Sequence, residues 1–142
     1  MDTILTERRR IVTEAERALL MARLREELLT RPEIVFAYLH GSFAARCPFR
    51  DVDVAIWAEG IDREQAWDYE TKLSVALTQA LGVEVDIRLL NFAPIGFCLA
   101  AANGILLFSR NDELRCDFLE RIGRIYMDFA WLAKEMLREA LR

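Results

Sequence analysis

Two aspartates that stand one residue apart are the clearest chemical signal in the chain. Asp51 and Asp53 follow a Gly41-Ser42 step after eight intervening residues, and they lead into the apolar run at residues 54–57. Because side chains alternate along a strand, both carboxylates would point to the same side. Two negative charges held that close repel each other, and a divalent cation relieves the repulsion. Hard oxygen ligands of this kind suit Mg²⁺, so the spacing predicts a magnesium site.

The Gly41-Ser42 step would supply the phosphate-binding part of such a site. Glycine lets the backbone approach a phosphate, and the serine hydroxyl and nearby N–H groups can donate to its oxygens. A lone Asp-x-Asp is usually only a pair of polar residues at the end of a strand. Its coupling to an upstream Gly-Ser step favours a site for a metal and a nucleotide.

A third acidic position lies further along the chain. Residues 83–87 alternate between apolar and acidic side chains, so Glu84 and Asp86 would share one face of a strand. If this strand lies beside that of Asp53, Asp86 can approach the same metal. Glu84 competes for that role, and an aspartate on the wet face of a half-exposed strand is the ordinary alternative. The predicted triad of Asp51, Asp53 and Asp86 would serve phosphoryl or nucleotidyl transfer.

Alternating strands and helices predict a single domain of the α/β class, with a small mixed sheet flanked by helices. We expect an N-terminal helical segment at residues 1–30, a sheet core with the site at residues 33–108 and a C-terminal helix at residues 111–142. Strands are expected near residues 33–39, 51–57, 83–90 and 105–108.

Capping residues mark where the helices should begin. Thr13 opens a capping box, Asp62 with Gln65 caps a second helix, and Asn111 or Asp112 caps the last one. The aromatic residues of that last helix are expected mainly in the core, with some left for a subunit interface, where Tyr and Trp are enriched. They are Phe118, Tyr126, Phe129 and Trp131.

Composition narrows the function classes. Hydrophobic residues make up 54% of the 142 residues, which leaves room for an apolar partner surface, and the net charge of −4 argues against broad nucleic-acid binding. Lys72 and Lys134 are the only lysines, so a Walker-type phosphate grip is excluded. Three scattered cysteines and a single histidine argue against a zinc site. Reduced thiols, and a sequence without a signal peptide or membrane span, lead us to expect a cytoplasmic protein.

The motif resembles that of the minimal nucleotidyltransferases of the DNA polymerase β superfamily. The resemblance rests on His-Gly-Ser-Phe-Ala at residues 40–44, Asp-Val-Asp-Val at residues 51–54, and Asp86. Within the superfamily, the chain is most similar to the MntA-type antitoxins of bacterial MntA/HepT pairs. That similarity rests on chain length and on a tail in which residues 104–108 precede an arginine-rich helix.

The resemblance implies a polymerase-β-like fold and a Mg²⁺-dependent enzyme. Such an enzyme transfers AMP from ATP to a tyrosine of a HepT-type HEPN ribonuclease toxin, and it forms a hetero-oligomer with that toxin. Asp51, Asp53 and Asp86 would be the metal-binding and catalytic residues, and Asp86 would take the proton of the acceptor hydroxyl. Gly41 and Ser42 would hold the β- and γ-phosphates.

The chain departs from the family pattern around the Gly-Ser loop. The spacer to Asp-x-Asp is about two residues shorter than usual. Ala45-Arg46 stands where Arg-Gly is common, and Arg50 replaces a small or polar residue. Because guanidinium groups suit phosphate geometry, Arg46 and Arg50 are predicted to bind the nucleotide. His40 is expected to pack at the end of a strand rather than act as a base.

Two alternatives remain open at this point. The chain could be a non-catalytic antitoxin that neutralises its partner by contact alone, or it could adenylylate a small molecule such as an aminoglycoside. The second alternative is weakened by the length of the chain, which leaves little room for a separate substrate domain.

Overall fold

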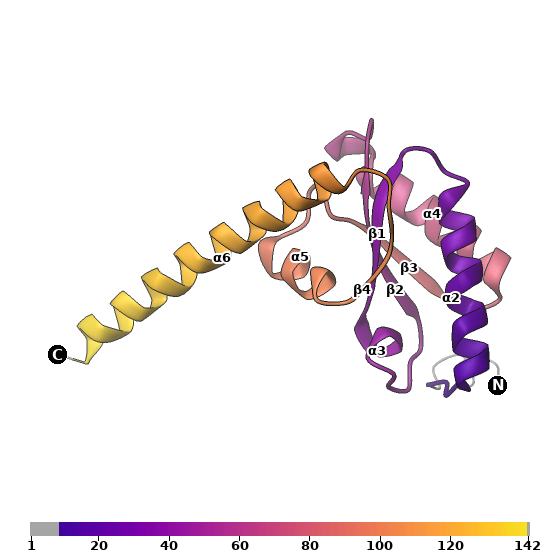
Figure 1. Ribbon diagram of the computed structural model, residues 1–142, viewed down its shortest axis with the longest axis horizontal. Helices are drawn as coiled ribbons and strands as arrows, with labels where there is room; N and C mark the ends of the chain where they lie inside the picture. Colours follow the sequence, from indigo (N-terminus) through magenta and orange to yellow (C-terminus); the bar gives the residue numbers. More distant parts are fainter. Residues whose placement is uncertain (1–8, 142) are drawn as a thin grey trace.

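The computed structural model describes residues 9–141 and places four strands in one sheet, in the order β3-β2-β1-β4 (Figure 1). The strands are β1 (Ile34–His40), β2 (Val52–Ala58), β3 (Val85–Leu89) and β4 (Ile105–Ser109). β1 runs antiparallel to β2 and β4, whereas β2 runs parallel to β3. The sheet is therefore mixed, as predicted. The part of the expected N-terminal segment at residues 1–8, and residue 142, lie outside the described residues.

Helices cover both faces of this sheet. Their bounds are α2 (Glu14–Leu29), α3 (Gly41–Ala44), α4 (Ala66–Leu81), α5 (Ile95–Ala102) and α6 (Asp112–Ala140), with a 3₁₀ turn, η1 (Arg63–Gln65), before α4. α2 and α4 pack on one face, while α5 and the first turns of α6 pack on the other. β1 lies between two strands and under helices on both sides, which explains why its apolar run is unbroken.

Alternation along β2 decides which face carries the polar residues. Val54 and Ile56 point into the core under α2 and α4, and Ala55 and Trp57 point toward α5 and α6. Asp53 shares the second face by the same alternation. The candidate site therefore lies on the face of the sheet that α5 and α6 partly cover.

Thr13 and an asparagine cap their helices as predicted, whereas Asp62 caps the 3₁₀ turn η1, which leads into α4, and not α4 itself. Thr13 forms a reciprocal capping box with Glu16, and Asp62 forms one with Gln65. Asn111, rather than Asp112, caps α6, because its side-chain oxygen accepts a hydrogen bond from the Leu114 N–H at 3.0 Å. Local sequence thus determines where these helices start.

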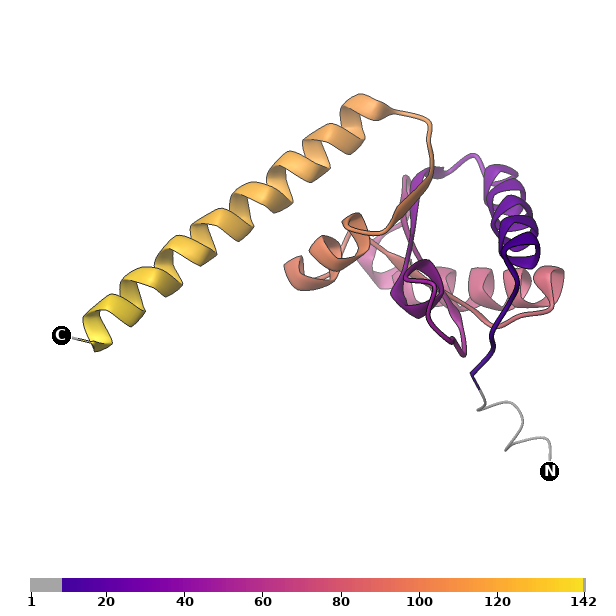
Figure 2. The ribbon, with the colours of Figure 1, turned by 60° about the horizontal axis from the view of Figure 1, so that its bottom comes forward.

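The last helix differs from the sequence-based expectation. Phe118 is buried, but Tyr126, Phe129 and Trp131 are 54%, 69% and 64% exposed, so the expectation that they lie mainly in the core is wrong. α6 packs against the body only through its first turns and then projects away from it, as Figures 1 and 2 show. Among the described residues, no helix combines the length and apolar character needed to span a membrane.

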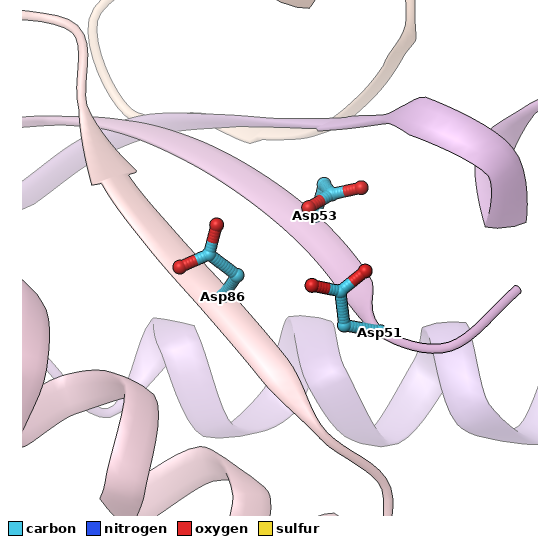
Figure 3. Close-up of side chains that lie close together, drawn as sticks. All are labelled: Asp51, Asp53 and Asp86. Atoms are coloured by element: carbon cyan, nitrogen blue, oxygen red, sulfur yellow. The ribbon is translucent and has the colours of Figure 1, made fainter. Parts of the chain in front are cut away.

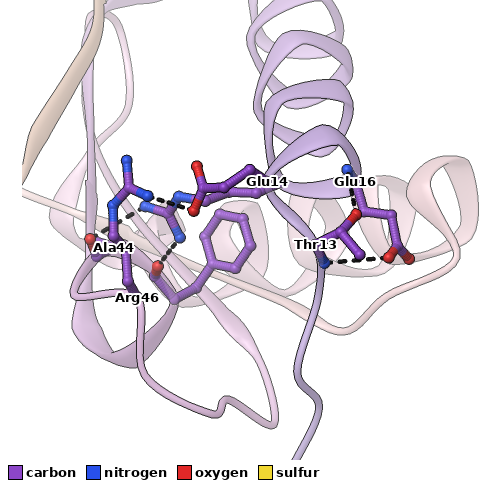
Figure 4. Close-up of polar contacts among 7 residues, drawn as sticks. Thr13, Glu14, Glu16, Ala44 and Arg46 are labelled. Carbon is purple, nitrogen blue, oxygen red and sulfur yellow. Dashed lines mark hydrogen bonds and ion pairs between the residues drawn. The ribbon is translucent and has the colours of Figure 1, made fainter.

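A buried arginine fastens α2 to the short helix α3, close to the ion pair of Glu14 and Arg46 that Figure 4 shows. Arg17 is only 6% exposed. Its guanidinium donates to the carbonyl oxygen of Phe43 and, at 3.1 Å, to that of Ala44. It also lies over the Phe43 ring, 4.5 Å from the centroid. One turn earlier on α2, Glu14 forms an ion pair with Arg46. α2 thereby holds the turn that carries Gly41 and Ser42.

Replacing Arg17 should loosen this attachment. We expect Arg17→Met to lower the free energy of unfolding by about 1–3 kcal/mol, because two carbonyl oxygens lose their buried donor. Urea unfolding measures the change. Arg23→Met is the matched control, since Arg23 also donates to a backbone carbonyl, that of Ala80, but at an exposed site. Equal losses in the two variants would contradict a special role for the buried guanidinium.

Candidate active site

Three carboxylates converge at one end of the sheet (Figure 3). Asp53 on β2 and Asp86 on β3 are direct neighbours in the parallel register, and Asp51 lies one residue before β2 begins. One oxygen atom from each of the three lies within 4.8 Å of the others. Within residues 9–141 this is the one group of three or more side chains that could ligate a metal ion in this way. Glu84, the competitor for the third place, lies outside β3 and is not in the group.

The electrostatics of the cluster explain what it would bind. Burial raises the pKa of Asp53 to about 6, and the negative charges of Asp51 and Asp86 add to this effect, while Arg88 opposes it. A bound divalent cation would turn this repulsion into attraction. Carboxylate oxygens are the ligands that Mg²⁺ prefers, so the donor set fits that ion.

Gly41 lies directly against this cluster. Its φ of +77° is in the left-handed region that favours glycine. A Cβ at this position would overlap the Asp53 Oδ2 atom and would lie 3.1 Å from its Cγ. Any larger residue would therefore push a candidate metal ligand aside as well as strain the turn. Ser42 follows in the first turn of α3 and is half-buried.

His40 packs at the end of β1, in agreement with the sequence-based expectation. It pairs with Asp53 across the antiparallel register, and its ring stands edge-on to that of Phe97 at 5.2 Å between centroids. The Nε2 atom is buried without a hydrogen-bond partner among the described residues. Burial lowers the pKa of His40, although the charges of Asp86 and Asp51 act against this. The imidazole is therefore a neutral wall of the site.

A cavity of about 460 Å³ opens beside the cluster. Asp53 and Asp86 line it together with Glu70, Arg88, Phe92 and Phe97, among others. Sequence reasoning missed these last four residues. Strand alternation could have identified Arg88, because it lies two residues after Asp86 on the same face of β3. The two side chains form an ion pair at 3.4 Å. A cavity of about 500 Å³ near Tyr69 and Lys72 contains none of the three aspartates.

The two arginines of the loop lie apart from this cavity. Arg46 forms an ion pair with Glu14 and lines a separate cavity of about 270 Å³ with Arg17 and Phe43. Its φ of +62° lies in the left-handed region that favours glycine, which costs an arginine about 1–2 kcal/mol. Arg50 is exposed and directly precedes Asp51.

The fold and this cluster define a nucleotidyltransferase. A family model described as polymerase beta, nucleotidyltransferase, matches residues 22–113, which is more than half of the chain. The chain therefore belongs to this family. No curated protein matches the sequence.

Solved structures of toxin–antitoxin complexes share the fold. A chain from the complex of a tri-AMPylated Shewanella oneidensis HEPN toxin with an MNT antitoxin is 20% identical, with a TM-score of 0.64, and the match covers 89% of this chain and 99% of that one. A chain of the MntA-HepT toxin–antitoxin is 19% identical, with a TM-score of 0.58 and coverage of 92% and 100%. A toxin–antitoxin structure with AMP-PNP gives the same identity, TM-score and coverage.

The raised pKa of Asp53 predicts a pH-dependent effect on stability. Between pH 3.8 and about 6, the folded state keeps a proton on Asp53 that the unfolded state has lost. The stability that this proton confers on the folded state is present below that window and is lost as the pH rises through it. In the absence of divalent cations, we expect Asp53→Asn to raise the free energy of unfolding at pH 7 by about 1–2 kcal/mol, allowing for partial exposure.

Urea unfolding at pH 4 and pH 7 tests this expectation. The gain should vanish at pH 4, where both side chains are neutral. Asp117→Asn, at an exposed position on α6, is the control and should show little change at either pH. A gain of equal size at both pH values would refute the electrostatic origin.

Proposed function

We propose that this protein is a Mg²⁺-dependent adenylyltransferase that transfers AMP from ATP to a tyrosine of a HepT-type HEPN ribonuclease toxin, and so acts as its antitoxin. The observation that carries the proposal is the convergence of Asp51, Asp53 and Asp86 beside Gly41. Membership of the nucleotidyltransferase family supports the transfer chemistry. The structures with a tri-AMPylated toxin and with AMP-PNP support the choice of acceptor and nucleotide.

Each residue has a defined task in this reaction. Asp51, Asp53 and Asp86 would hold Mg²⁺, which when bound neutralises the triphosphate and aligns the attacking and leaving oxygens. Gly41 and Ser42 donate N–H and hydroxyl hydrogens to the β- and γ-phosphates. The tyrosine oxygen forms a bond to the α-phosphorus, pyrophosphate leaves with the bridging oxygen, and the tyrosine proton passes to Asp86.

The cavity beside the cluster supports an aromatic group at the reacting centre. Phe92 and Phe97 line its apolar part, while Asp53 and Asp86 line its polar part. Aromatic side chains pack favourably against a planar ring in edge-on or offset arrangements. Arg88, paired with Asp86, balances part of the negative charge until the cation and nucleotide are bound.

The proposal places the reaction in the cytoplasm. All three cysteines, Cys47, Cys98 and Cys116, are free. Unpaired thiols are typical of a reducing compartment, which is also where ATP and a ribonuclease substrate would be found together.

Neutralisation by contact alone is the second candidate. It is favoured by the pairing of Arg46 with Glu14, which turns one of the two loop arginines toward α2. The exposed apolar residues of α6 also suit a protein that acts by binding. The two candidates differ in whether the toxin gains mass.

The loop arginines provide a prediction about nucleotide binding. We expect Arg50→Ala to weaken the binding of a non-hydrolysable ATP analogue by about 1.5–3 kcal/mol, the size of a charge-assisted hydrogen bond. Arg46→Ala should weaken it less, because that guanidinium is already paired with Glu14. Isothermal titration calorimetry measures both, with Arg124→Ala on α6 as the control. Unchanged affinity in both loop variants would show that neither arginine binds the triphosphate.

Intact mass spectrometry of the toxin tests the reaction itself. After incubation with this protein and Mg·ATP, the HEPN protein should gain one or more AMP units. The Asp53→Asn variant, mixed with the toxin at the same concentration, should add no AMP, because a metal ligand is lost. An unmodified toxin that is nevertheless fully neutralised would establish neutralisation by contact instead.

A further inference from the structure

The apolar stripe that anchors α6 to the body continues past the point where the helix leaves it. Its members follow one another at alternating steps of four and three residues, the spacing of a coiled-coil seam. They are Phe118, Ile122, Ile125, Phe129, Leu132 and Met136. The first two are buried, with exposed fractions of 3% and 4%, whereas the remaining four are between 46% and 69% exposed. The same seam is thus covered by the body at one end and uncovered at the other.

The uncovered part exposes more apolar surface than a monomer usually leaves in water. We call residues 125–141 the distal surface. Its nine large apolar side chains are each 46% to 77% exposed, namely Ile125, Tyr126, Met127, Phe129, Trp131, Leu132, Met136, Leu137 and Leu141. At about 200 Å² for a large side chain, they present roughly 1,000 Å² of surface around the helix, of which the four exposed seam residues contribute about 450 Å². A standard protein interface buries about 800 Å² on each partner, and monomers rarely expose a patch of more than a few hundred Å².

The charges of the distal surface exclude two kinds of occupant. It contains two basic residues, Lys134 and Arg138, and three acidic ones, Asp128, Glu135 and Glu139. An amphipathic helix that lies on a membrane carries a polar face rich in Lys and Arg, and nucleic-acid binding also needs an excess of positive charge. Neither condition is met, so the occupant is a protein.

A second copy of this chain fits poorly. An antiparallel pair would place Ile125 against Met136 and Phe129 against Leu132 of the other copy. The same register brings Asp128 next to Glu135 of the other copy, whose charge Arg138 balances only in part, and symmetry repeats this contact. Like charges that flank a seam destabilise the pairing. The acidic residues beside the seam, Asp128 and Glu135, instead suit a partner helix with basic residues on either side of an apolar stripe.

We propose that the distal surface is where the HEPN-type partner docks, with basic side chains of the partner against Asp128 and against Glu135, which also pairs with Arg138 at 2.9 Å. This inference rests on the proposed function, which supplies the partner. A ribonuclease carries positive charge to bind RNA, which complements this flank. α6 packs on the face of the sheet toward which Asp53 and Asp86 also point. A toxin docked there is therefore held on the side of the molecule that carries the candidate active site.

Paired substitutions on two helices test the proposal. Leu132→Glu places a charge in the distal surface, and Leu19→Glu makes the same change at a similarly exposed leucine on α2; the two are 50% and 61% exposed. Affinity for the cognate HEPN protein is measured by titration, and circular dichroism checks that each variant keeps its helices. We expect Leu132→Glu to weaken binding by about 100-fold or more, as for a central interface residue, and Leu19→Glu by less than about twofold.

A charge variant adds an independent readout. Asp128→Lys should weaken binding by about tenfold and should reduce its dependence on salt, because an attractive pair is replaced by a repulsive one. Light scattering on the chain alone should report a monomer. A dimer that Leu132→Glu converts to a monomer would overturn the proposal and assign the distal surface to a second copy.

The remaining outcomes separate this inference from the proposed function. If the toxin gains AMP but Leu132→Glu binds as tightly as Leu19→Glu, the docking proposal fails and the proposed chemistry stands. If binding depends on Leu132 but the toxin gains no AMP, the chemistry fails and the docking surface stands. A wild-type chain that does not bind the HEPN protein overturns the docking proposal.

Discussion

The close contact between Gly41 and Asp53 is the constraint around which the site is built. It joins the turn after β1 to the side chain on β2, with no space for a Cβ between them. The turn can take this position because β1 and β2 are paired in register up to His40 and Asp53. The parallel pairing of β2 with β3 then brings Asp86 alongside. These two strand registers together determine the separation of Asp53 from Asp86 and the distance of Asp53 from the Gly-Ser turn.

The support for this contact comes from the opposite side of the sheet. Arg17 and Glu14 on α2 hold α3 and the loop behind it, while the capping box at Thr13 fixes where α2 begins. The left-handed backbone of Arg46 is tolerated within this framework, and its side chain contributes the ion pair with Glu14. The loop that departs most from the family pattern is therefore the one that α2 holds in place.

Features encoded by local sequence were predicted well. Alternation predicted the orientation of Asp53 and of Asp86 within their own strands, and the caps at Thr13 and Asn111 were predicted from short motifs. Features that depend on distant parts of the chain were not predicted. Phe97 reaches the cavity only through the position of α5, and no local pattern shows where α6 leaves the body. The side chain of Phe129 has the same hydrophobic character whether it lies in a core or in solvent.

The projection of α6 affects how quickly the free protein is degraded when no partner is bound. A helix without tertiary contacts is only marginally stable in water, so its distal turns open and close on their own. An open apolar segment is what cellular proteases and chaperones engage. Covering residues 125–141 would protect them from cleavage, whereas cleavage near Gly123 would leave the sheet intact. The lifetime of the free chain would then be set by the supply of its partner, which couples the abundance of the two proteins.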